Sequence, residues 1–123
     1  MGIDFQIVPI AIASAAIVAD IISGVVKGCA TGTLSSSIMR EGLWHKVASL
    51  LLLFVSWMVN ISVGIWDVLP QQMGLVYEAC CIYVCGMELI SILENVCAAN
   101  PELSIKKLFA IFNVEREDDR DDY

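Results

Sequence analysis

Charged residues are scarce in this sequence, and that scarcity argues against an ordinary soluble domain. Of its 123 residues, only 17% are charged and 58% are hydrophobic, which gives a mean hydropathy of +0.74. A soluble domain of this length needs more polar surface than such a composition supplies. The composition therefore indicates a membrane protein, and the length suits a single domain.

Histidine and paired cysteine motifs are also lacking, which argues against metal and catalytic chemistry. His45 is the only histidine, and the five cysteines include no Cys-x-x-Cys pair. Zinc and iron–sulfur sites need ligand spacings that are absent here. Because His45 has no recognisable nucleophile to activate, we expect neither an enzyme nor a bound metal or cofactor. The cysteines are interpreted as small apolar fillers of helices.

Negative charge is concentrated at the C-terminus. Residues 115–123 hold six acids and two arginines, a net charge of −4 out of −7 for the whole chain. A nucleic-acid-binding protein would present a basic face, so we expect no nucleic-acid partner. We expect residues 1–114 to form the membrane domain and residues 115–123 a disordered, solvated acidic tail.

Three apolar stretches are long enough to cross a bilayer, whose hydrocarbon core of ~30 Å needs about 20 helical residues. They cover residues 5–26, 47–66 and 73–98. Gly28 and Gly32 are expected to end the first stretch. A serine is expected to cap a short helix over residues 35–45, lying along the interface. The predicted fold is an all-α membrane protein with three transmembrane helices and this short interfacial helix.

Basic residues predict the orientation of the chain in the membrane. They occur after the first span (Lys27, Arg40 and Lys46) and after the third span (Lys106, Lys107, Arg116 and Arg120). The N-terminal segment and the second loop contain none. Positively charged loops stay on the cytoplasmic side, so we expect the N-terminus outside and the C-terminus inside.

The first two spans each carry a face suited to contact with another helix. On the first span, one face groups small and charged residues: Ala13, Ala16, Asp20, Gly24 and Lys27. Small residues let helices approach closely, so this is the predicted packing face. On the second span, Ser56 and Asn60 lie at i, i+4 and are predicted to form hydrogen bonds to a neighbouring helix.

The third span is more acidic than a membrane helix usually is. It contains Glu78, Glu88 and Glu94, which makes a soluble amphipathic helix the rival interpretation. The nine residues before Glu88 hold no charge and no amide, and apolar side chains there cover every face, which favours a span. The Asn100-Pro101 pair is expected to end this helix.

A polar band lies within the third span, between Met87 and Val96. Glu88, Ser91 and Asn95 fall within about 60° of one helix face, and Glu94 widens the band to about 120°. A carboxylate at bilayer depth costs ~2.5 kcal/mol or more, so Glu88, the deepest acid, needs a partner, a proton or water. The band either holds a helix bundle together or lines a pore, and the two interpretations are compatible.

These polar residues resemble the pattern of a known family. The matching residues are Asp20, Gly24 and Lys27, then a serine cluster with Gly42 and Lys46, then Glu88, Ser91, Glu94 and Asn95, and finally Pro101 and Leu108. In this order and in membrane context, they resemble the phage holins of the Cp-1 and toxin-secretion/phage-lysis type. The group includes clostridial toxin-release holins.

The resemblance implies a homo-oligomer in the bacterial cytoplasmic membrane of the host. At a set time, such proteins form lesions through which a cytoplasmic endolysin, or a toxin, leaves the cell. The resemblance also implies that another copy of the chain is the partner of Glu88. The residues alone leave two alternatives open: a small ion channel or proton-coupled transporter, and a membrane adaptor whose acidic tail binds a cytoplasmic partner.

Overall fold

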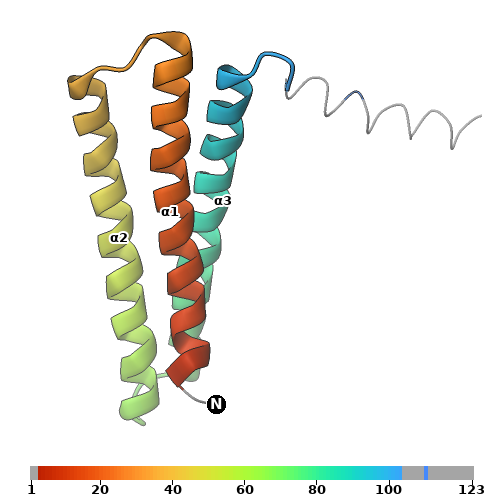
Figure 1. Cartoon of the computed structure of the whole chain (residues 1–123). Coiled ribbons are helices and arrows are strands. Elements are labelled where there is room, and N and C mark those ends of the chain that lie inside the picture. The colour runs from red at the N-terminus through yellow and green to blue at the C-terminus, as the bar shows by residue number, and fades with distance from the viewer. Residues whose placement is uncertain (1–2, 104–109, 111–123) are drawn as a thin grey trace, which may run out of the picture.

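In the part of the chain that the structure describes, three long helices run up, down and up (Figure 1). The computed structural model describes residues 3–103 and residue 110. Its helices are α1 (Ile3–Thr31), α2 (Ser36–Ile65) and α3 (Gly74–Ala99), with the short 3-10 helix η1 (Gln71–Met73) before α3. Each long helix is apolar enough to cross a membrane. The predicted all-helical fold with three spans is therefore confirmed for residues 3–103.

The first loop is shorter than the sequence predicted. α1 continues through Gly28 to Thr31, and the chain turns at Gly32, whose φ of 67° favours glycine. The expected break at Gly28 is wrong because Leu34 folds back over that residue. A Cβ at Gly28 would lie only 2.8 Å from the Leu34 Cδ1 atom. Gly28 therefore makes room for the loop within an unbroken helix.

The structure does not form the separate interfacial helix predicted over residues 35–45. Those residues after Ser35 are the first turns of α2, which runs unbroken for 30 residues. The Ser35 hydroxyl caps this helix by accepting a hydrogen bond from the Ile38 N–H at 3.3 Å. Gly42 is the weakest helix former beyond the cap, and a glycine costs only about 1 kcal/mol in a helix interior. α2 therefore continues without a break into the predicted transmembrane stretch, residues 47–66.

The third helix ends where the sequence predicted. Ala99 is its last residue, and Asn100 adopts an extended conformation before Pro101. Residues preceding proline are pushed out of the helical region, which explains the position of this end. The predicted acidic tail, residues 115–123, lies outside the described residues.

The core is small and lies mostly between α1 and α3. These two helices pack together most extensively, whereas α1 and α2 touch least. The buried cluster consists of Ala13 and Ile17 of α1, Leu53 of α2, and Tyr77, Cys81 and Val84 of α3. Most other large apolar side chains of the helices are exposed. Exposed apolar surface on this scale suits a lipid environment or contact with further copies.

Candidate functional site

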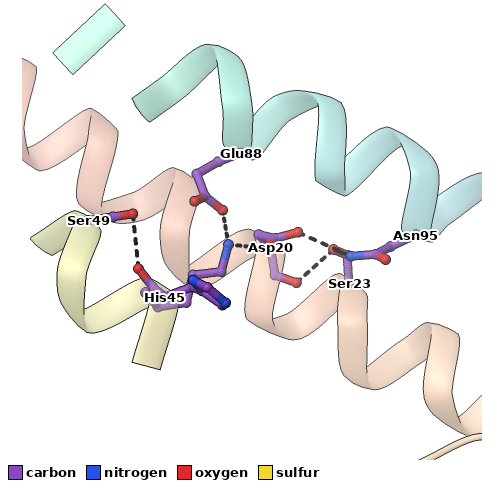
Figure 2. Close-up of polar contacts among 7 residues, drawn as sticks. Asp20, Ser23, His45, Ser49, Glu88 and Asn95 are labelled. Atoms are coloured by element: carbon purple, nitrogen blue, oxygen red, sulfur yellow. Dashed lines mark hydrogen bonds and ion pairs between the residues drawn. The ribbon is translucent and has the colours of Figure 1, made fainter. Parts of the chain in front are cut away.

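A charged cluster joins the three helices. The Lys46 ammonium of α2 forms ion pairs with Asp20 of α1 and with Glu88 of α3. The two acidic side chains are each 7% exposed and the Lys46 side chain is 17% exposed. Figure 2 shows Asp20 and Glu88 pointing toward each other from their two helices. Buried charges of this kind are stable only when they are paired.

The three charged residues lie at one level of the bundle. Asp20 is 11 residues before the end of α1, Lys46 is 10 after the start of α2, and Glu88 is 11 before the end of α3. At about 1.5 Å per residue, each lies ~15–17 Å from the same end of the bundle. A hydrocarbon core is ~30 Å thick. This level is therefore near mid-helix, where protein groups are the main partners available to a charge.

Asn95 extends the cluster toward the end of α3. Its Nδ2 donates to the Asp20 Oδ1 at 3.1 Å and to the Ser23 Oγ at 3.0 Å (Figure 2). The Ser23 hydroxyl in turn donates to the Asp20 backbone carbonyl at 2.9 Å. Asp20 thus receives hydrogen bonds from α3 as well as an ion pair from α2. The network ties α1 to both neighbours.

Negative charge exceeds positive charge in the cluster. It contains two carboxylates and one ammonium, so its formal net charge is −1 when all three groups are ionised. Among the described residues, Lys46 is the one cation that pairs with the two acids. The ion-pair bridge between the three helices therefore depends on this one side chain.

The residues of the predicted polar band on α3 fall into two groups in the structure. Glu88 and Asn95 point into the cluster, and Ser91 is half-buried between them. Glu94 is exposed and lies away from it. The partner of Glu88 in this structure is Lys46 of the same chain, where the resemblance implied another copy. Because Lys46 pairs with Glu88 within one chain, the carboxylate does not require a second chain as its partner.

The predicted packing face of α1 is buried in part. Ala13 and Asp20 are buried, Ala16 and Gly24 are half-buried, and Lys27 is exposed. Ile17 and Ser23 complete the buried face and were not predicted. A role for this face in contacts with further copies stays a prediction.

The polar residues of α2 behave differently from each other. Ser56 is buried, but its hydroxyl donates to the Leu53 carbonyl of its own helix at 2.9 Å. A serine easily reaches a carbonyl one turn back. The predicted hydrogen bond from Ser56 to a neighbouring helix stays a prediction. Asn60 does lie against another helix. Its Oδ1 is 3.3 Å from the position that a Cβ at Gly74 would occupy.

Sequence reasoning missed the role of Lys46 and that of Tyr77, whose hydroxyl bonds to the Gln6 carbonyl and the Ile10 N–H of α1. By sequence, Lys46 is a basic residue of the first loop and part of the family pattern, and neither makes it the partner of an acid, although it directly precedes a span that has no charge of its own. The signal was the presence of Asp20 in the first span and Glu88 in the third. Acids at that depth need a cationic partner, and a lysine next to a span can supply one. Tyr77 gave no comparable signal, because an aromatic residue near the start of a span is also typical of an interfacial position.

The cluster contains two carboxylates and one ammonium, which is not a typical set of metal ligands. Among the residues that the structure describes, no group of three His, Cys, Asp or Glu side chains is placed to hold a metal ion. The cluster supplies charge balance and hydrogen bonds between helices.

Comparison with known proteins gives one match. The model of the bacteriophage holin family matches residues 6–113. The matched span contains the whole charged cluster and nearly all of the three helices. No curated protein and no solved structure matches the chain significantly.

Proposed function

Because the chain belongs to the bacteriophage holin family, we propose that it self-associates in the bacterial cytoplasmic membrane and forms lesions that release an endolysin or a toxin. The family is one of membrane pore-forming proteins rather than enzymes. Three long apolar helices fit a multipass membrane protein. The released cargo acts on the cell wall or outside the cell, and the chain supplies the opening.

The charged cluster is the observation that carries this proposal. In a single chain, Asp20, Lys46 and Glu88 face one another and are shielded from the surroundings. Exposing any of them to lipid would be costly, whereas exposing them to water would not. The same side chains therefore suit two states: a closed bundle in lipid and an assembly around a water-filled hole.

The helix that we propose to move is α2. It contributes only Lys46 to the cluster, and its contact with α1 is the weakest among the three helices. Moving α2 outward would break both ion pairs and uncover a polar stripe that includes Asp20, Glu88 and Asn95. In the open assembly, this stripe lines the hole.

The exposed apolar surface supports assembly. Large side chains on all three helices face outward, including Ile22 of α1, Leu51 of α2 and Ile82 of α3, each more than half exposed. In a crowded membrane, copies meet through such surfaces, and van der Waals packing between them replaces contacts with lipid.

A small ion channel is the second candidate function. Carboxylates within spans also occur along ion pathways, and Asp20 and Glu88 lie close together at mid-helix. The two functions differ in the size of the solute that passes. Purified protein should therefore be reconstituted in vesicles loaded with a small dye and a protein-sized fluorescent dextran. Release of both supports a holin, whereas ion flux without dye release supports a channel.

Lysis timing tests the role of the stripe in cells. Glu88→Leu and Asn95→Leu are each expected to shift the onset of lysis at unchanged protein level and membrane insertion. Glu94→Leu is the matched control, because Glu94 lies on the same helix but is exposed outside the cluster. Loss of membrane potential and of culture density after induction gives the onset. Unchanged timing in both cluster variants would contradict the proposal.

A further inference from the structure

A groove separates α1 from α2 near the loop that joins them. Figure 1 shows the two helices moving apart toward this loop. The groove has a volume of about 460 Å³, and its walls are mostly apolar: Ile21 and Val25 on α1, Met39 and Leu43 on α2. Apolar walls at bilayer level are not filled stably by water, so hydrocarbon is the natural filling.

One cation in the groove wall has no partner among the described residues. Arg40 lines the groove and forms no ion pair within residues 3–103. Lys46 also lines it, but the Asp20 carboxylate in the same wall opposes its charge. The lining therefore has a net positive charge at Arg40. Because Arg40 is only one turn from the start of α2, this charge lies at the loop end.

We propose that this groove binds one anionic phospholipid, with the headgroup phosphate at Arg40 and an acyl chain along the apolar walls. Basic pockets between membrane helices on the cytoplasmic side are known to hold such headgroups. The charge of the groove and its apolar walls match the two parts of the lipid. The proposal does not depend on the proposed lysis function.

The charge of the groove favours a lipid over a helix from a second copy. Its lining combines the positive charge of Arg40 with apolar side chains. An anionic phospholipid supplies a phosphate for the first and an acyl chain for the second.

The position of the groove links the lipid to the charged cluster. Asp20 and Lys46 line the groove and also form the ion pair between α1 and α2. A lipid bound there would contact both α1 and α2, the pair of long helices with the least contact between them. It would therefore help to hold α1 and α2 together.

Binding can be measured by native mass spectrometry of the full chain in detergent micelles. The protein is titrated with phosphatidylglycerol or with phosphatidylcholine of the same acyl chains. The wild-type chain is expected to retain phosphatidylglycerol in preference to phosphatidylcholine, and Arg40→Gln to reduce that preference about fivefold. Lys27→Gln is the matched control, because Lys27 is an exposed cation near the same end of the bundle but outside the groove.

A second variant tests the groove without changing its charge. A Cβ at Gly42 would meet no atom within 4 Å, so Gly42→Leu should fill the groove and leave the helix intact. It is expected to reduce retention of phosphatidylglycerol while Arg40 remains. Circular dichroism checks that both variants keep the helical content of the wild type.

Three results would overturn the proposal. Equal losses in Arg40→Gln and Lys27→Gln would show general attraction of anionic lipid to a basic surface. Unchanged retention in Gly42→Leu would place the lipid elsewhere. A dimer that is lost in Arg40→Gln and Gly42→Leu, with no lipid retained by the wild type, would assign the groove to a second copy.

Discussion

The Tyr77 hydroxyl of α3 donates a hydrogen bond to the Gln6 backbone carbonyl of α1 at 2.5 Å. The same hydroxyl accepts a hydrogen bond from the Ile10 backbone N–H at 3.1 Å. Gln6 and Ile10 are four residues apart, so an undisturbed helix would join their backbone groups directly. The tyrosine hydroxyl thus bridges that pair beside Pro9, which has no N–H to donate. It fixes the first turns of α1 to the start of α3.

Removing this hydroxyl should loosen the end of the bundle that lies away from the charged cluster. We expect Tyr77→Phe to lower the free energy of unfolding by about 1 kcal/mol, the usual net value of a hydrogen bond in a protein. The loss stays small because the Gln6 and Ile10 backbone groups can then bond to each other. Denaturant titration in detergent, followed by circular dichroism, measures the change.

Tyr83→Phe is the matched control for that substitution. Tyr83 lies on the same helix, but its side chain is 61% exposed. It should leave the free energy of unfolding unchanged. Equal stability of the two variants would show that the Tyr77 bridge contributes nothing.

Lys46 should be the most sensitive position in the bundle. Lys46→Met removes the cation that, among residues 3–103, pairs with both Asp20 and Glu88. Breaking a buried ion pair by deleting one partner typically costs 3–5 kcal/mol, and we expect a loss of about that size. We also expect earlier loss of membrane potential in cells, because α2 is then held less firmly. Lys27→Met, at an exposed position, should change neither quantity.

The excess of acid predicts an asymmetry between Asp20 and Lys46. Asp20→Asn leaves the Lys46–Glu88 pair in place and neutral, and the new amide oxygen can still accept from Asn95. We expect the free energy of unfolding to change by no more than about 1 kcal/mol, far less than for Lys46→Met. A loss as large as that of Lys46→Met would show that both carboxylates are needed in ionised form.

The spans were predictable from the sequence, because length and hydropathy decide them. Their ends were less predictable. Glycine is typical of a helix end, but Gly28 lies inside α1. A glycine is needed there because Leu34 packs against it, and only the structure shows that contact. Residues 35–45 have an interfacial composition, yet the Ser35 cap starts a helix that nothing later interrupts. Local signals account for the cap of α2 and for the end of α3, whereas a tertiary contact with Leu34 is needed to explain why α1 continues past Gly28.

The cluster was predictable only in part. The sequence identified Glu88 and Asn95 as polar residues in need of partners and placed Asp20 on a packing face. It did not identify Lys46 as the partner, because the residue belongs by sequence to a basic loop. Which residues share a level of the bundle depends on where three helices begin and end. One sequence does not give that register.

The orientation of the chain remains a prediction, and Cys29 offers a direct test. This residue is exposed near the loop end of α1, the end that also carries Lys27 and Arg40. If basic loops stay in the cytoplasm, Cys29 faces inward.

A variant that retains Cys29 and carries serine at the other four cysteines should react with a membrane-impermeant maleimide only after the cells are permeabilised. A variant with cysteine at Val68 instead, which is 93% exposed in the second loop, should react in intact cells. The reverse pattern would place the basic loop outside, and with it the groove at Arg40.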